Sequence, residues 1–252
     1  MDALQRSVDR GTKRAIKHFW SSRQAAQSSQ RERGVSDQGG RAGVTAGKNM
    51  DGFADVVKRV ALESGTKPES ILLGPRRIQT VPGFYRATKN WDLLILNDGR
   101  LTAAIEFKSQ VGPSFGNNFN NRVEEALGNA TDLLTAYREG AFGDVPKPFL
   151  GYFFVLEECP LSMRPVRFDS PHFSVFEEFK DTSYAQRYEI LCRKLVLEQL
   201  YDAAALLLVK RSEARAGKYR CLSTMTSISQ FAAALSGKCT ADRAVVRSSA
   251  RQ

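Results

Sequence analysis

Residues 91–110, WDLLILNDGRLTAAIEFKSQ, constrain the fold of this chain more than any other stretch. Two apolar runs, at 93–96 and 101–105, flank the sequence NDGR. Its Asp-Gly pair takes the positive φ angles that a tight hairpin turn requires. The stretch therefore predicts a β-hairpin whose strands carry charged side chains only near their outer ends.

Three charged residues stand at those outer ends: Asp92 opens the first strand, and Glu106 and Lys108 close the second. Side chains alternate between the faces of a strand, so Glu106 and Lys108 share a face while Phe107 turns into the core. A three-residue loop, or a two-residue loop with one bulge, puts Asp92 on the Glu106 face; a plain two-residue loop puts it on the opposite face. A site shared by Asp92 and Glu106 therefore predicts a loop with an odd number of residues, or a bulge.

Two carboxylates that meet at one point repel each other and are stable together when a cation lies between them. Hard oxygen ligands with open positions suit Mg2+, so Asp92 and Glu106 are candidate metal ligands. Lys108 would add a positive charge beside the attacking water and the scissile phosphate, which lowers the pKa of the water and offsets charge on the phosphorane. The residues indicate phosphodiester hydrolysis with Asp92, Glu106 and Lys108 as catalytic residues and either one or two metal ions.

The order of these residues resembles the PD-(D/E)XK nuclease signature, with Asn90-Trp91 where that pattern usually has a proline. A longer run is more specific. From GVSDQGGRAGVTAGKNMDGF (34–53) through KNWDLLILNDGRLTAAIEFKSQVGPSFGNNFNNRVEEALGNATDLLTAY (89–137), the chain resembles the XhoI-type restriction endonuclease family. The resemblance implies a restriction-endonuclease-like fold and a Mg2+-dependent homodimer that cuts duplex DNA at the palindrome CTCGAG, a site that a cognate DNA methyltransferase would also recognise.

The composition favours a nucleic-acid partner. The net charge is +10, and the basic residues are spread along the chain among Asn, Gln and aromatic residues rather than gathered on one amphipathic helix. No stretch approaches the ~20 apolar residues of a membrane helix, and the first residues lack the apolar centre of a signal peptide, so we expect a cytoplasmic protein. Four widely separated cysteines without a C-x-x-C pair favour reduced, mostly buried thiols over a zinc site.

Basic and amide side chains outside the hairpin are candidates for DNA contacts. The Gly- and Arg-rich segment 30–48 is expected to be either a flexible linker or an arm that orders on DNA. Residues 109–121, SQVGPSFGNNFNN, are expected to be a loop whose asparagines read bases, with turn and helix-cap roles as the alternative. Asp55 and Glu63, on an expected helix at 51–64, are candidates for a further metal ligand. The DNA-contact candidates are Arg41, Lys48, Arg76, Arg77, Lys89, Gln110, Asn118, Asn120, Asn121 and Arg122.

Hydrophobic periodicity predicts further helices over 2–28, 123–139 and 183–211. The continuous apolar run at 148–157 predicts a strand buried on both faces, and the helix before it makes a crossover connection, hence an α/β fold with a central mixed sheet flanked by helices. We also expect an edge strand at 219–224, a short helix at 228–235 and a disordered basic tail from 236.

These elements group into three regions: an N-terminal helix with a DNA-contacting arm (1–48), a catalytic core (49–160), and a C-terminal helical region that completes the core or the dimer interface (161–252). Three hypotheses for the function remain open. They are a type II restriction endonuclease, a repair or junction-resolving nuclease of the same fold, and a non-catalytic nucleic-acid-binding protein in which the two acids simply pair with Lys108. The first requires a two-fold dimer, because both strands of a palindrome must be treated alike.

Overall fold

The predicted hairpin lies within a five-stranded sheet in a computed structural model that describes residues 3–32, 49–74 and 76–249. The strand order is β1-β4-β5-β6-β7, with antiparallel pairs β1/β4 and β4/β5 and parallel pairs β5/β6 and β6/β7. This mixed sheet confirms the α/β prediction. The strands are β1 (Ile71–Leu72), β4 (Leu93–Asn97), β5 (Arg100–Gln110), β6 (Phe149–Glu157) and β7 (Ala203–Val209), with a separate hairpin of β2 (Thr80–Pro82) and β3 (Thr88–Asn90).

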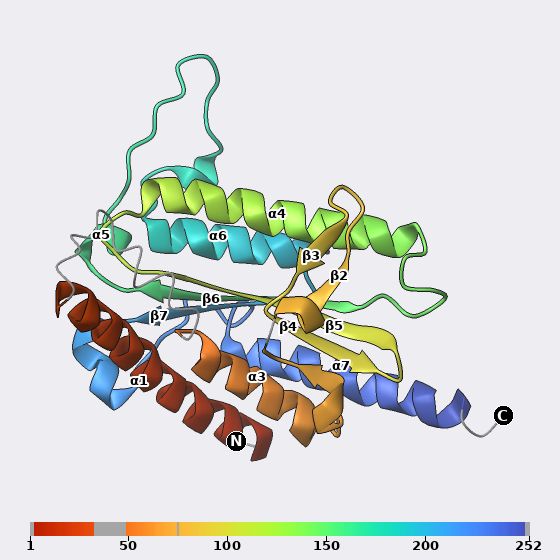
Figure 1. Ribbon diagram of the computed structural model, residues 1–252. Helices are drawn as coiled ribbons and strands as arrows, with labels where there is room; N and C mark the ends of the chain where they lie inside the picture. The colour runs from red at the N-terminus through yellow and green to blue at the C-terminus, as the bar shows by residue number, and fades with distance from the viewer. Residues whose placement is uncertain (1–2, 33–48, 75, 250–252) are drawn as a thin grey trace.

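Helices cover both faces of the sheet (Figure 1), so the chain forms three layers. Two apolar cores result: one between the sheet and α1, α3 and α7, the other between the sheet and α4 and α6. The α-helices are α1 (Ala3–Glu32), α3 (Asp51–Glu63), α4 (Gly116–Arg138), α5 (Pro160–Met163), α6 (Tyr184–Leu197) and α7 (Ile228–Ser249). Short 3-10 helices are η1 (Pro68–Ser70), η2 (Arg76–Gln79), η3 (Glu177–Phe179) and η4 (Arg211–Ala216).

The β4–β5 hairpin has a two-residue turn and one bulge. Asp98 and Gly99 form the turn with φ angles of 49° and 77°, the left-handed values that an Asp-Gly pair accepts. The pairing runs Asn97 to Arg100 next to the turn and shifts by one residue between Ile95 and Leu96, beyond which Leu93 lies opposite Ile105. The predicted bulge is confirmed.

Strands β6 and β7 are buried along their whole length. This confirms the predicted strand at 148–157, but the long helix expected over 183–211 is wrong. Helix α6 ends at Leu197, the chain turns through Gln199 with φ 57°, and the run AAALLLV becomes β7. A short run that is apolar on every side fits a buried strand as well as a buried helix, and pairing with β6 decides between them.

Two further expectations are corrected. Helix α4 begins at Gly116, so only 111–115 of the expected loop at 109–121 lies outside β5 and α4. At the other end of the chain, α7 runs from Ile228 to Ser249 in place of a short helix and a disordered tail. Its buried stripe continues through Leu235 to Cys239, and Phe231 packs against Gly151 of β6, where an added Cβ would lie 2.8 Å from the ring. The expected strand at 219–224 is reduced to one bridge between Leu208 and Arg220.

Helix α1 covers the predicted 2–28 helix from Ala3, and α3 ends before Gly65 as expected. Helix α1 extends to Glu32, so residues 30–32 of the expected linker or arm are helical instead. The segment 33–48 lies outside the described residues. Cys192 and Cys239 are buried and Cys159 and Cys221 are partly buried, all as free thiols. Among the described helices, none is long and apolar enough to cross a membrane.

Helices α1 and α3 cross at close range, which yields a test of the packing. A Cβ added to Gly52 would lie 2.9 Å from the Cα of Ala15, whereas one added to Gly128 of α4 meets nothing within 4 Å. Gly52→Ala should lower the free energy of unfolding by ~1–3 kcal/mol through overpacking. Gly128→Ala should raise it by ~0.5–1 kcal/mol through helix propensity. Denaturant titrations measure both values, and equal stabilisation of the two variants would contradict the close crossing.

Candidate active site

Asp92 and Glu106 face the same side of the sheet. The bulge places Leu93 opposite Ile105, so the residues before and after this pair, Asp92 and Glu106, lie together on the α4 face. A hydrogen bond to the backbone of β5 holds the Asp92 side chain in place: the amide of Phe107 donates to Asp92 Oδ2 at 2.7 Å. Glu106 is 2% exposed, whereas Asp92 is reached by solvent. The site is therefore a pair of carboxylates in which Glu106 is buried and Asp92 is open to solvent.

Two lysines neutralise Glu106. Lys108 Nζ lies 2.5 Å from Glu106 Oε1, and Lys89 Nζ lies 2.9 Å from Glu106 Oε2. Lys89 comes from β3, the strand that leads directly into Trp91 and Asp92, and its ammonium lies 5.0 Å from the Trp91 ring centroid. Sequence reasoning placed Lys89 among the phosphate contacts; the structure brings it into the carboxylate cluster.

The charges of the cluster shift two pKa values. Burial and then the neighbouring Glu106 carboxylate raise the pKa of Asp92 from 3.8 to about 6. Burial opposes the charge on Lys108, but the carboxylates of Glu106, Asp92 and Glu125 outweigh it and raise the pKa of Lys108. Lys108 therefore remains an ammonium at neutral pH. A cation near Asp92 would favour the ionised form of its carboxyl group.

Sequence reasoning missed Glu125, which α4 carries to the edge of the cluster. Its carboxylate lies 3.5 Å from Lys108 Nζ and 2.5 Å from Arg122 Nη1. Burial acts against ionisation, yet Lys108 and Arg122 together lower the pKa of Glu125. The spacing of Arg122 and Glu125 on one helix face was visible in the sequence, but their approach to Lys108 depends on how α4 crosses the sheet.

The structure does not bring Asp55 or Glu63 into this cluster. Both belong to α3, which packs in the core on the opposite face of the sheet, and Glu63 instead accepts a hydrogen bond from Ser7 at 2.5 Å. Among the described residues, no group of three or more Asp, Glu, His or Cys side chains is arranged to hold a metal ion. Asp92 and Glu106 are the two carboxylates that the register of the β4–β5 hairpin places together.

The remaining DNA-contact candidates divide into three groups. Arg41 and Lys48 lie outside the described residues, as do the side chains of Arg76 and Arg77. Gln110 is 4% exposed and bonds internally, donating to Ser114 O and accepting from the hydroxyl of Tyr188, so it holds the loop at 111–115 rather than facing outward. The first turns of α4 carry the other four: Asn120 and Asn121 are exposed, Asn118 donates to Ser114 O, and Arg122 pairs with Glu125.

Comparison with known proteins places this chain in a family. Residues 29–221 match the family model described as Restriction endonuclease XhoI. The chain belongs to the XhoI restriction endonuclease family. It is 48% identical over 189 residues to the type II restriction enzyme BstVI of Geobacillus stearothermophilus, which covers 73% of this chain and 84% of that enzyme. It is also 48% identical over 190 residues to the type II restriction enzyme XhoI of Xanthomonas vasicola, covering 75% and 76% of the two chains.

Family membership decides among the three hypotheses for function. An XhoI-family member with such relatives is a type II restriction endonuclease, an enzyme that binds DNA as part of a restriction-modification system. The repair nuclease and the non-catalytic binding protein therefore fall away. No solved structure matches this chain.

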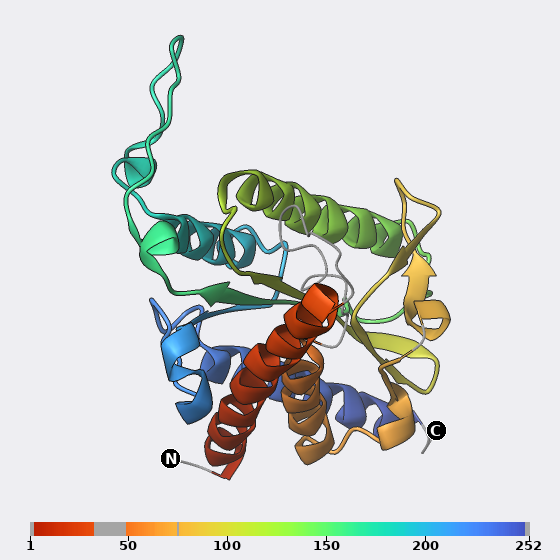
Figure 2. The ribbon, with the colours of Figure 1, turned by 60° about the vertical axis from the view of Figure 1, so that its left-hand side comes forward.

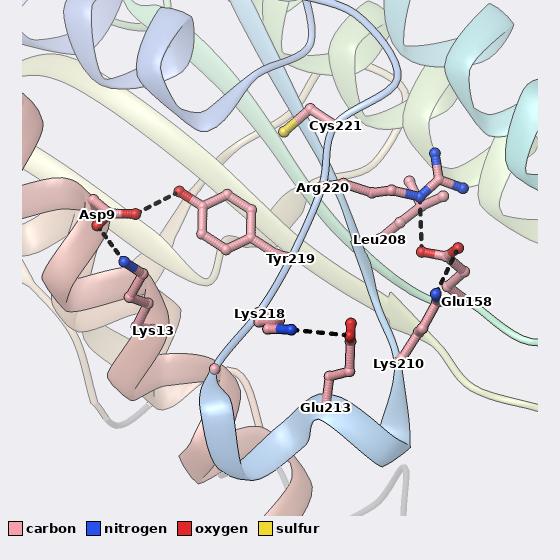
Figure 3. A pocket seen from close by; sticks show the side chains of 11 residues that line it. Asp9, Lys13, Glu158, Leu208, Lys210, Glu213, Lys218, Tyr219, Arg220 and Cys221 are labelled. Carbon is pink, nitrogen blue, oxygen red and sulfur yellow. Dashed lines mark hydrogen bonds and ion pairs between the residues drawn. The ribbon is translucent and has the colours of Figure 1, made fainter.

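A separate pocket of about 500 Å3 lies on the α1 side of the sheet and contains none of the catalytic candidates. Figure 3 shows its charged side chains paired with one another: Lys13 with Asp9, Lys218 with Glu213, and both Lys210 and Arg220 with Glu158. These pairs leave little excess charge in the pocket to attract an ion.

The raised pKa of Asp92 predicts a pH-dependent stability. The folded protein binds this proton more tightly than the unfolded chain does, so this stabilisation is fully present below pH 3.8 and is lost as the pH rises through about 6. In EDTA at pH 8, Asp92→Asn should raise the stability by ~1 kcal/mol after allowance for solvent screening, or ~2–4 °C in Tm, and the gain should vanish near pH 4. Calorimetry across this range measures it.

Asp98→Asn provides the matched control, because it makes the same change of charge on the exposed turn of the same hairpin. Its effect on Tm should not vary in this way between pH 4 and 8. A parallel pH profile for the two variants would show that the Asp92 carboxylate is not crowded by Glu106.

Proposed function

We propose that this enzyme cuts both strands of duplex DNA at CTCGAG as a homodimer, by Mg2+-dependent hydrolysis at the Asp92, Glu106 and Lys108 cluster. The observation that carries the proposal is the shared face of Asp92 and Glu106, a carboxylate pair of the kind that a hard divalent cation stabilises. The target sequence is proposed because the relatives include the type II restriction enzyme XhoI. The dimer is proposed because a palindrome presents the same site twice.

Asp92 and Glu106 would hold the metal ion. When bound, Mg2+ polarises the phosphate and lowers the pKa of a coordinated water. Lys89 and Lys108 already contact the two oxygens of Glu106, so either lysine can turn to a phosphate oxygen when a cation takes over that carboxylate. Lys108 keeps its proton, so its role is to place positive charge beside the charge that develops on phosphorus. Glu125 positions Lys108 from the other side.

The α4 N-terminus is the proposed reader of bases. Asn120 and Asn121 are exposed and follow the loop that β5 leads into from the catalytic residues. Asparagine amides pair bidentately with adenine, and CTCGAG contains adenine on both strands. Arg41, Lys48, Arg76, Arg77 and Lys89 remain proposed phosphate contacts, Asn118 and Arg122 support the same helix end, and Gln110 is left out because its side chain is used internally.

A plasmid with a single CTCGAG tests the target sequence. With Mg2+ it should be converted to the linear form, and a plasmid in which one base pair of the site is changed should stay intact. Each wrong base pair typically costs ~1–3 kcal/mol in recognition, so the initial rate at the altered site should be lower by roughly 5- to 150-fold. Equal cutting of the two plasmids, or cutting without a divalent metal, would contradict the proposal.

Substitutions test the assigned residues. Asp92→Asn, Glu106→Gln and Lys108→Ala should each lower the single-turnover cleavage rate by at least ~1,000-fold, because each removes a group that acts on the reacting phosphate. Lys108→Ala should still bind a CTCGAG duplex in Ca2+ within about tenfold of the parent. Lys218→Ala, at the far pocket, is the control and should cut normally. Near-parental cleavage by Lys108→Ala would remove that residue from the site.

A further inference from the structure

The segment between α5 and α6 leaves the body of the protein on an anchored stem. Pro165 pairs with Ser183, and the amide of Val166 donates to Thr182 O at 2.9 Å. Arg187 of α6 ties both sides together, donating to Val166 O at 2.8 Å and to Thr182 Oγ1 at 3.1 Å. Beyond this stem, residues 167–181, called the arm below, extend away from the three layers (Figures 1 and 2).

The arm places large apolar side chains in water. Phe173 is 82% exposed and Phe176 is 79% exposed, and Phe168 at the base is 39% exposed. A phenylalanine left in solvent forgoes the stabilisation that burial of its ring would give, and long loops of this kind in compact domains are usually functional. Two such rings on a tip with a fixed base indicate a surface that another molecule covers.

The charge of the arm separates two classes of partner. It carries Arg167 and Lys180 against four acids, a net charge of −2 within a chain of +10. DNA repels an acidic arm, so phenylalanines presented on it are poorly suited to a phosphate-lined groove. The basic body of a second copy attracts the same arm. The acids are Asp169, Glu177, Glu178 and Asp181.

We propose that the arm docks on a second copy of this chain, with Phe173 and Phe176 as its apolar anchors and the acids around them facing the basic surface of the partner. This inference rests on the homodimer of the proposed function and names the element that holds it. In a two-fold dimer the contact occurs twice, so four phenylalanines leave water when two arms engage. Anchors of this type, aromatic side chains buried at the centre of an interface, commonly dominate its energy.

The first test measures the oligomeric state. Sedimentation equilibrium of the full chain in EDTA, without DNA, should show a dimer, and Phe173→Ser with Phe176→Ser should raise the dimer dissociation constant by at least ~100-fold. Because these rings are largely exposed in the single chain, the Tm of the separated chain should not fall. A parent that is monomeric, or a double variant that remains as tightly dimeric as the parent, would overturn the inference.

The turn between β2 and β3 supplies a matched control. Phe84 and Tyr85 are 52% and 70% exposed, and Asp132 holds them in place by accepting hydrogen bonds from their amides at 2.9 and 2.7 Å. Phe84→Ser with Tyr85→Ser removes as many exposed aromatic rings from another part of the surface. It should leave the dimer dissociation constant within about threefold of the parent.

A photo-crosslinking amino acid at position 173 identifies the occupant directly. Illumination with and without a CTCGAG duplex in Ca2+ should give a covalent adduct of two chains in both cases. An adduct with DNA alone, or no adduct, would overturn the assignment to a second copy. These measurements do not use cleavage, so failure of the arm proposal leaves the plasmid result standing, and failure of cleavage leaves the dimer result standing.

Discussion

The one-residue shift between Ile95 and Leu96 is the constraint on which the site depends. On its turn side, Asn97 pairs with Arg100; on its far side, Leu93 pairs with Ile105. Without the extra residue in β5, the side-chain alternation would send Asp92 and Glu106 to opposite faces. The buried hydrogen bond from Asn97 Nδ2 to Thr102 Oγ1, 3.0 Å long, satisfies polar groups beside the bulge. The metal chemistry proposed here is therefore a consequence of strand register.

Charge compensation is the second constraint, because the shared face brings two acids together in a partly buried place. Lys89 and Lys108 each pair with one oxygen of Glu106, and the Phe107 amide donates a hydrogen bond to one oxygen of Asp92. Glu106 is thus fully paired, whereas Asp92 has a pKa of about 6 and no ion pair of its own among the described residues. This asymmetry gives the two acids different parts in the proposed site: Glu106 is held in position by its two lysines, and Asp92 is the carboxylate that would gain most from a bound cation.

Strand register and hydrophobic period account for what the sequence predicted. The hairpin, its bulge and the double-sided burial of 148–157 follow from alternation and turn chemistry over a few residues. The wrong predictions lie where more than one structure fits the same pattern. The run AAALLLV is apolar enough for a helix or a strand. Helix α7 continues past Gly237, although glycine has a low helix propensity. Glu125 and the internal role of Gln110 depend on where α4 and α6 cross the sheet, which no local pattern specifies.

The two faces of the sheet carry different demands. The family match at 29–221 contains all five strands of the central sheet together with α4 and α6, whereas α1 lies almost wholly before it and α7 after it. Both of these helices cover the face opposite Glu106, in the core that holds Phe107 and Ile105. That core requires an apolar stripe of the right width and close approach at a few small residues. The α4 face must also hold Lys89 and Lys108 within hydrogen-bond range of Glu106, so sequence freedom should be greater on the face that α1 and α7 cover.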